Sequence, residues 1–305
     1  MFSATLSENS STRVTFNPSA SSCGVTSAIG FPAISGIVRG FGPALTTRPI
    51  AEPFGISGGA QAAIQLVPRL RPIGRAAVLG PTYNEHAACL EAEGWQTKTV
   101  PDLAGLQGAD LAVVVNPNNP DGRQFSPETL LVLVGQVGLL VVDESFGDVT
   151  PALSLLPHAG RAGLLVLRSF GKFYGLAGLR LGFAFGTAEE IAALTQMSGP
   201  WPTSGPALEI GTKALADHAW ADAMRAQLAA DAARADVLAL SAGWRLAGGT
   251  ELFRLYETGN AKAAQDKLAH HKIWSRIFPW SETLLRLGLP GPEAEWQRLE
   301  NALRP

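Results

Sequence analysis

The most informative stretch of the chain is residues 164–182, LLVLRSFGKFYGLAGLRLG. It begins with four apolar residues, the pattern of a short buried strand, and then becomes polar and rich in glycine. Lys172 stands here among serine, glycine and aromatic residues, and Arg180 follows eight residues later. A lysine amine that is shielded from water and lies near an arginine can act as a nucleophile, because both features favour its neutral form. The stretch therefore predicts a strand that ends in a catalytic loop.

Two apolar segments upstream also end in polar residues. Residues 111–115 (LAVVV) lead into NPNNPDG at 116–122, and residues 139–142 (LLVV) lead into DESF at 143–146. The carboxylate of Asp143 is costly to bury unless it meets a cation or a protonated partner. Because ligands bind at the carboxyl ends of strands in open α/β sheets, the catalytic groups should lie at these ends. Together these segments describe a pocket for pyridoxal phosphate.

Short apolar strands alternate with helices through the middle of the chain. Expected strands cover 75–79, 96–100, 111–115, 139–143, 164–168 and 181–186, and expected helices cover 60–70, 85–93 and 126–137. Asn84 should cap the second of these helices, and a capping box from Thr187 to Glu190 should open a further one. The alternation predicts an α/β domain whose mostly parallel sheet is covered on both faces.

We expect three parts in the chain. Residues 1–55 are dominated by turn formers and show no clear period, so they predict poorly specified structure. Residues 56–205 are expected to form the large domain, and residues 206–305 a smaller α+β domain. The expected elements of this last part are a long helix over 207–240, strands near 250–255, 273–278 and 283–288, and helices over 260–269 and from 292 onward.

The composition of the chain excludes several classes of protein and several kinds of binding partner. The 305 residues are 46% hydrophobic and 16% charged, enough for a full core. A net charge of −2 gives no general attraction for nucleic acid or an anionic membrane, and no apolar run approaches the ~18 residues of a membrane span. Cys23 and Cys89 lack the spacing of a zinc site or a disulfide framework. We expect a cytoplasmic protein without nucleic-acid, membrane or metal partners.

With NPNNPDG, VVDESF and SFGKFYGLAGLRLG in this order, the chain resembles the aspartate-aminotransferase-like, fold type I pyridoxal phosphate enzymes. Within that group, residues 59–300 look most like the threonine-phosphate decarboxylases, relatives of the histidinol-phosphate aminotransferases. The resemblance implies pyridoxal 5'-phosphate as cofactor, a homodimer, and a phosphorylated amino acid as substrate. It implies decarboxylation of L-threonine O-3-phosphate to (R)-1-amino-2-propanol O-phosphate in cobalamin biosynthesis, with histidinol-phosphate-type amino transfer as the alternative.

The resemblance also implies roles for single residues. Lys172 would hold the cofactor covalently and move the proton at the substrate α-carbon, and Asp143 would keep the pyridine nitrogen protonated. Asn119 would donate a hydrogen bond to the phenolic oxygen of the cofactor, and Tyr83 would stack on its ring. The corresponding structural interpretations are a surface lysine, a helix cap, a turn and a core tyrosine.

Anion binding is assigned to three arginines and a turn. Ser169 and Arg180 would bind the cofactor phosphate, since a guanidinium can donate hydrogen bonds to two phosphate oxygens at once. Backbone amides at the start of a helix would complete the site, namely those of Gly59, Ala60 and Gln61. Arg276 and Arg286 match the positions of two substrate-binding arginines, in either order for phosphate and carboxylate. Arginines on a solvent-facing strand are the alternative.

Two features depart from the family pattern. Phe146 stands where many relatives have a tyrosine whose hydroxyl bonds the cofactor, so Asn119 would carry more of that work. Residues 1–55 lack a recognisable segment for contacts with the substrate phosphate. A relative that binds the cofactor without catalysis is therefore a further alternative.

A different enzyme class also has to be weighed. Residues 55–59, GISGG, satisfy the G-x-S-x-G pattern of an α/β serine hydrolase, with His158, His270 or His271 as a base. That pattern needs a strand immediately before the serine, and two prolines in residues 48–53 argue against one.

Overall fold

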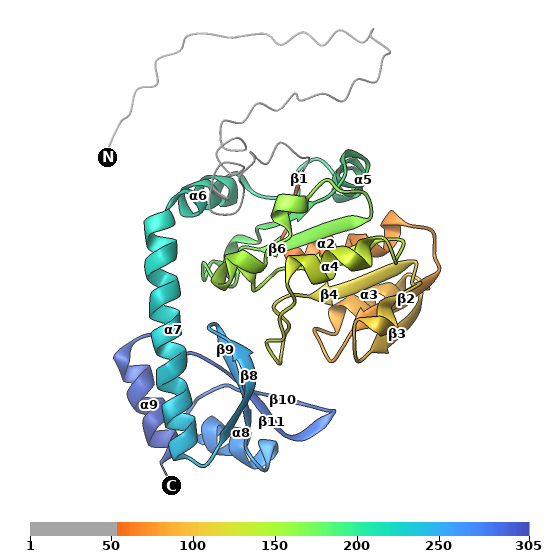
Figure 1. Ribbon diagram of the computed structural model, residues 1–305. Coiled ribbons are helices and arrows are strands. Elements are labelled where there is room, and N and C mark those ends of the chain that lie inside the picture. Colours follow the sequence, from red (N-terminus) through yellow and green to blue (C-terminus); the bar gives the residue numbers. More distant parts are fainter. Residues whose placement is uncertain (1–53, 305) are drawn as a thin grey trace, which may run out of the picture. The chain divides into compact units, whose positions relative to one another are not determined.

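In residues 54–304, which the computed structural model describes, seven strands form one sheet (Figure 1). Its strands are β1 (Phe54–Ser57), β2 (Arg75–Leu79), β3 (Gln96–Val100), β4 (Leu111–Val115), β5 (Leu140–Asp143), β6 (Leu164–Ser169) and β7 (Gly182–Phe185). Their order is β1-β7-β6-β5-β4-β2-β3. Strands β2 to β6 run parallel, whereas β7 is antiparallel to β6 and β1 to β7. This confirms the predicted α/β class with a mostly parallel sheet.

Helices cover both faces of this sheet. One face packs against α2 (Ala60–Leu66), α3 (Glu85–Ala92) and α5 (Ala188–Ser198). The other packs against α4 (Pro127–Val134) and the end of α6 (Gly205–Ala216). Short 3-10 helices span Val67–Leu70, Ala104–Leu106, Gly147–Val149, Pro151–Leu153, Leu156–His158 and Ala177–Leu179. Alternate residues of each central strand enter opposite cores, which explains why these strands are apolar throughout.

The described residues form a second, four-stranded antiparallel sheet in the order β10-β11-β9-β8. Its strands are β8 (Arg245–Thr250), β9 (Phe253–Glu257), β10 (Arg276–Phe278) and β11 (Ser281–Gly288), and its helices are α7 (His218–Ser241), α8 (Ala261–His270) and α9 (Glu293–Leu303). The three helices pack on the sheet face that carries Tyr256 and Leu285. Arg286 follows Leu285 and therefore lies on the opposite face, beside its register partners Arg276 and Leu255.

Several local expectations need correction. Asn84 precedes α3 with helical backbone angles, and its side chain makes no capping bond. The expected helix over 207–240 is two helices, because Asp217 interrupts it and caps α7 by accepting from the Trp220 N–H at 2.9 Å. An alanine-rich pattern does not reveal such a break.

The sequence analysis also missed two strands, β8 and β1. Strand β8 carries two glycines and a register shift, so its β propensity is poor, and the pattern predicted a single strand where the chain forms a β8–β9 hairpin. Strand β1 begins at Phe54, before the predicted boundary after residue 55. Residues 1–53 of that predicted segment, Cys23 among them, lie outside the described residues.

Candidate functional site

A cavity of about 300 Å³ lies at the carboxyl ends of β4, β5 and β6. Each residue predicted to bind the cofactor lines it: Gly59, Ala60, Gln61, Tyr83, Asn119, Asp143, Ser169, Lys172 and Arg180. These residues come from five separate stretches of sequence. The fold therefore brings an amine, a carboxylate, an amide and a guanidinium to one cavity.

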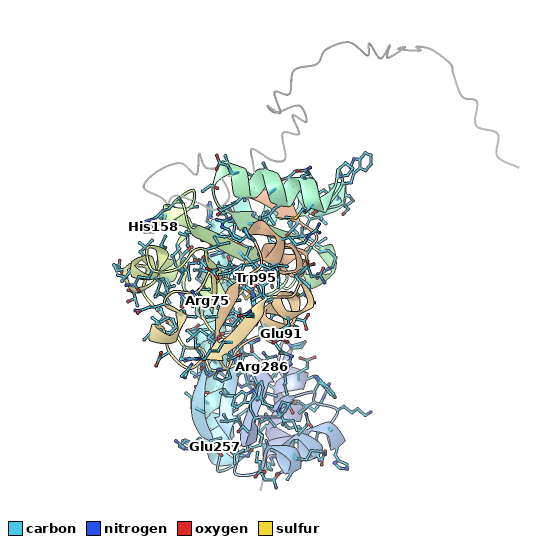
Figure 2. All side chains as sticks on the ribbon, turned by 90° about the vertical axis from the view of Figure 1, so that its right-hand side faces the viewer. Arg75, Glu91, Trp95, His158, Glu257 and Arg286 are labelled. Carbon is cyan, nitrogen blue, oxygen red and sulfur yellow. The ribbon has the colours of Figure 1, made fainter. Side chains whose placement is uncertain are left out.

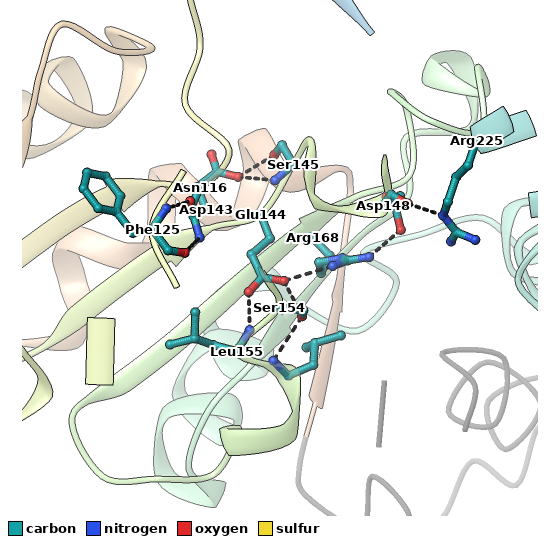
Figure 3. Close-up of polar contacts among 11 residues, drawn as sticks. Asn116, Phe125, Asp143, Glu144, Ser145, Asp148, Ser154, Leu155, Arg168 and Arg225 are labelled. Carbon is teal, nitrogen blue, oxygen red and sulfur yellow. Dashed lines mark hydrogen bonds and ion pairs between the residues drawn. The ribbon is translucent and has the colours of Figure 1, made fainter. Parts of the chain in front are cut away.

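Asp143 is buried, with 2% of its surface exposed, and it is held from both sides. His86 Nε2 lies 2.9 Å from Asp143 Oδ2. On the other side, Oδ1 accepts from the Ser145 backbone N–H at 2.9 Å and from the Ser145 hydroxyl at 2.5 Å (Figure 3). Burial by itself would raise the pKa of Asp143, but the hydrogen bond and charge of His86 and the donors of Ser145 outweigh it and lower that pKa. Asp143 is therefore held as a carboxylate.

Neither partner of Asp143 was found from the sequence. Ser145 could have been, because a serine two residues after an aspartate is well placed to donate to its side chain. His86 belongs to no motif. It meets Asp143 only because α3 packs on the sheet face next to β5, 57 residues further along the chain.

Lys172 lines the same cavity as this carboxylate, and its Nζ lies 5.6 Å from the centre of the Phe146 ring. Partial burial of the ammonium lowers the pKa of Lys172, and the positive charges of Arg286 and Arg180 lower it further, while Asp143 acts in the opposite direction. A lowered pKa increases the fraction of neutral, nucleophilic amine.

Ser169 and Arg180 line the cavity beside the start of α2. Glycines allow this close approach: a Cβ on Gly59 would lie 2.7 Å from Arg180 Nη2, and one on Gly182 would lie 2.4 Å from the Ala60 nitrogen. Gly59 has a φ of +90°, which glycine adopts readily. Arg180 has a left-handed φ of +53° and donates to the carbonyls of residues 177 and 58. Its guanidinium and the backbone at residues 59–60 thus share one corner of the cavity.

The two predicted substrate arginines lie differently. Arg286, which is labelled in Figure 2, donates through Nη1 to Asn119 Oδ1. The NH₂ of that amide therefore points away from Arg286 as a donor. Arg286 also stacks over the Phe253 ring, 5.2 Å from its centre, and Phe253 packs edge-on against Phe146 at 5.0 Å. Burial and the charge of Arg276 lower the pKa of Arg286.

Arg276 lines a second cavity of about 370 Å³. Tyr83 and Asn119 line both cavities, so the second adjoins the first, and Trp280 forms part of its wall. The Tyr83 hydroxyl donates to Gln61 Oε1 at 3.1 Å. Arg276 therefore reaches the neighbouring space and not the cavity that holds Lys172.

Behind Asp143 the polar strand ends are tied together by a buried charge network (Figure 3). Arg168 donates to Glu144 at 2.9 Å and to Asp148, and Arg225 of α7 donates to the backbone carbonyl of Asp148 at 2.8 Å. Burial raises the pKa of Glu144 despite these donors. The network joins the residue after Asp143 to the end of β6, the strand that leads to Lys172.

The serine-hydrolase alternative fails on its geometry. Contrary to the expectation from the prolines, strand β1 does precede the GISGG turn. However, Ser57 is buried and donates its hydroxyl to the Gly59 carbonyl at 2.9 Å. Within residues 54–304 no hydrogen bond joins Ser57 to a histidine, so it has no base to activate it.

Comparison with known proteins places the chain in one family. The family described as "Aminotransferase class I and II" matches residues 51–303. The threonine-phosphate decarboxylase of Pseudomonas aeruginosa is 43% identical over 252 residues, covering 80% of this chain and 76% of that protein. The histidinol-phosphate aminotransferase of Salmonella paratyphi B is 34% identical over 198 residues, covering 57% of this chain and 53% of that protein.

Solved structures share the architecture. The histidinol-phosphate aminotransferase of Sinorhizobium meliloti, solved in complex with pyridoxal-5'-phosphate, superposes with a TM-score of 0.80 at 23% identity, covering 89% of this chain and 80% of that one. This confirms the fold type I class that the motifs implied. With a family match over most of its length and a cavity lined by the residues of the three motifs, the chain belongs to the class I and II aminotransferase family of pyridoxal phosphate enzymes.

Proposed function

We propose that this chain is a pyridoxal phosphate-dependent decarboxylase that converts L-threonine O-3-phosphate to (R)-1-amino-2-propanol O-phosphate, a step of cobalamin biosynthesis. The observation that carries the proposal is the 43% identity with a threonine-phosphate decarboxylase over 252 residues. The fold by itself would not select this reaction, because related enzymes use one architecture for several reactions.

The cavity residues fit the cofactor. Lys172 offers an amine of lowered pKa, Asp143 an ionised carboxylate, and Arg180 a guanidinium beside backbone that glycines leave open. These are the groups that an aldehyde, a pyridine nitrogen and a phosphate require. We infer that Lys172 holds the aldehyde carbon, Asp143 faces the ring nitrogen, and Ser169 with Arg180 binds the phosphate.

When bound, the cofactor supplies an electron-accepting ring that stabilises the negative charge left at the substrate α-carbon after a bond breaks. Asp143 would accept a hydrogen bond from the protonated ring nitrogen, while His86 and Ser145 hold its carboxylate in place. Lys172 in its protonated form would deliver a proton to the α-carbon after the carboxylate has left as carbon dioxide. Because Arg286 donates to the carbonyl end of the Asn119 amide, the NH₂ of Asn119 would be available to donate to the phenolic oxygen of the cofactor.

The type of reaction depends on which bond to the substrate α-carbon stands perpendicular to the cofactor ring. A decarboxylase turns the carboxylate out of the ring plane, so the substrate must be anchored by another group. Phosphate is such a group. The guanidinium of Arg286 donates to Asn119, which lines both cavities, and Arg276 lines the adjoining cavity. We propose that these arginines grip the substrate phosphate and leave the carboxylate free to rotate.

Amino transfer from histidinol phosphate is the second candidate, supported by 34% identity with an aminotransferase over 198 residues. One experiment separates the two: the purified chain is incubated with pyridoxal phosphate and either O-phospho-L-threonine or L-histidinol phosphate with a keto acid acceptor. We expect carbon dioxide and amino-propanol phosphate from the first mixture. Transamination product without carbon dioxide would overturn the decarboxylase proposal, and no product from either mixture would indicate a relative that binds cofactor without catalysis.

We also propose that two chains associate and that the enzyme works in the cytoplasm. Dimerisation is supported by the family resemblance and by exposed apolar residues on neighbouring segments, Trp201, Ile210 and Trp220. Within residues 54–304, no helix has the length and apolar character to cross a bilayer. Sedimentation of the holoenzyme checks the assembly, and a monomer that turns over substrate would contradict it.

A further inference from the structure

The loop that carries Asn119 is fixed to the seven-stranded sheet. Asn118 is buried, accepts from the Thr82 hydroxyl at 2.6 Å, and donates to the Pro81 carbonyl at 3.0 Å and to Asp121 Oδ1 at 2.7 Å. Arg123 donates to the Gly80 carbonyl at 2.7 Å. These bonds tie both ends of the loop to the segment that follows β2, so residues 116–123 form a rigid part of the first sheet.

Strand β8 of the second sheet meets this loop backbone to backbone. The Gly249 N–H donates to the Asp121 carbonyl at 2.9 Å. A Cβ on Gly248 would lie 2.2 Å from the Asp121 oxygen, and a Cβ on Gly122 would lie 2.0 Å from the Gly249 oxygen. No other residue fits these positions without separating the two segments. We call the contact of residues 121–122 with 248–249 the glycine seat.

The sequence of β8 shapes the seat. Its pairing with β9 shifts register between Leu246 and Gly248, the sign of a β-bulge. A bulge bends a strand and turns its backbone out of the regular ladder. Strand β8 also lies at the edge of its sheet, so the Gly249 N–H can face the loop of the first sheet. The glycines and the bulge that kept β8 from being predicted also allow this contact.

The seat and Arg286 form a closed ring of contacts. Strand β8 pairs with β9, and β9 pairs with β11, which carries Arg286. Arg286 returns to the loop by donating to Asn119, three residues before Gly122. Since the loop is rigid and the sheet ladder is rigid, the separation of the two backbones at the seat sets where the Arg286 guanidinium lies.

We propose that Gly122, Gly248 and Gly249 are positioning residues whose close contact holds Arg286 on Asn119 and so sets the affinity for the phosphorylated substrate. This rests on the proposed function, in which Arg286 grips that substrate. The cofactor cavity itself is lined by the first sheet and its loops. Cofactor binding rests mainly on those residues, so it should change little when the seat is altered, whereas substrate binding should weaken.

The test uses Gly248→Ala, since the nearest atom to the new methyl is the Asp121 carbonyl oxygen and the backbone of residue 248 is not left-handed. Gly288→Ala is the matched control: it lies in β11 of the same sheet, with open space around its Cβ position. We expect Gly248→Ala to raise the KM for O-phospho-L-threonine about fivefold, because displacement weakens a charge-assisted contact without removing it. The cofactor spectrum and affinity should not change, and the control should behave as the wild type.

A double-mutant cycle with Arg286→Gln shows whether the seat acts through Arg286. In that background, Gly248→Ala should have no further effect on KM, because the contact that it displaces is already absent. An equal fold-change in both backgrounds, an unchanged KM in Gly248→Ala, or a parallel loss of cofactor affinity would overturn the proposal.

Two further measurements keep the outcome clear. If Gly248→Ala does not fold, hydrogen exchange on the wild-type holoenzyme decides: the Gly249 amide should be protected without substrate, and rapid exchange would refute the seat. If the wild type does not decarboxylate O-phospho-L-threonine, the proposed function fails on its own. The double-mutant cycle is then measured on the dissociation constant of O-phospho-L-threonine, obtained by spectral titration. The effects of Gly248→Ala and Arg286→Gln on that constant should again be non-additive.

Discussion

The two sheets contribute to the candidate site in different ways. The seven-stranded sheet places its groups at strand ends and in the loops that follow, within three short motifs and two additional turns. The four-stranded sheet contributes Arg286 from the middle of β11 and Arg276 from its register partner β10. In the proposed function, cofactor contacts therefore depend on local sequence, whereas substrate contacts depend on how one sheet is held against the other. The predictions below separate these two dependencies.

The largest effect is expected from Lys172→Ala. Without the amine, turnover should fall by on the order of 10⁴-fold or more, since a nucleophile and proton carrier is lost. Borohydride reduction of the wild type with pyridoxal phosphate should attach the cofactor to the peptide of Lys172, and the variant should not be labelled. Attachment to Lys98 or Lys213 would show that the cavity assignment is wrong.

Asp143→Asn tests the other cofactor group of the first sheet. An amide cannot stabilise a protonated ring nitrogen as a carboxylate does, so kcat should fall by about 10²- to 10³-fold with KM little changed. Circular dichroism should match the wild type because the variant keeps the size of the side chain. Near-normal turnover would reduce Asp143 to a structural role.

Arg286→Gln tests the second sheet. The loss of a charge-assisted grip should raise the KM for the phosphorylated substrate by about 10- to 100-fold, while the affinity for pyridoxal phosphate changes little. Arg298→Gln on α9 is a control with the same loss of charge away from the cavity lining. If the Arg286 variant loses cofactor before it loses substrate affinity, the division of labour between the sheets is refuted.

His86→Asn should lower kcat about tenfold, less than the change at Asp143 that it supports. Loss of the His86 bond and charge should raise the pKa of Asp143, because they now hold it below the ordinary value. A group of lowered pKa keeps its charged form until the pH falls through that pKa. The acid limb of the activity profile should therefore move to higher pH, and an unmoved acid limb would contradict this coupling.

The smallest effect is a shift in the pH at which the apo chain captures cofactor. Capture needs a neutral Lys172 amine, so half-maximal trapping by borohydride should occur below pH 10.5, the ordinary pKa of a lysine. Arg286→Gln removes a charge that lowers this pKa, so the midpoint should rise. Asp143→Asn removes a charge that raises it, so the midpoint should fall. Shifts of the same sign in both variants would show that these charges do not act on Lys172.

Strands β2 to β7 of the first sheet could be predicted from the sequence because each shows its own local strand pattern, whereas β1 was not predicted. Strands such as β4 and β5 are apolar on both faces, since helices cover both, and the polar residues at their ends mark the cavity. Strand β8 was missed because two glycines and a bulge remove the periodic signal. Those glycines serve a contact with a distant loop, and no local pattern reports such a contact.

By itself, the sequence determined the α/β class, the cofactor and the residues around Lys172, because motif chemistry and strand ends lie next to one another along the chain. Tertiary structure alone decided that His86 and Ser145 hold Asp143, that Arg286 grips Asn119, and that glycines join the two sheets. The physical reason is how far apart in sequence the interacting residues lie. Strand patterns and loop motifs arise from neighbours in sequence, whereas these bonds join groups whose distance is set only when helices and sheets pack.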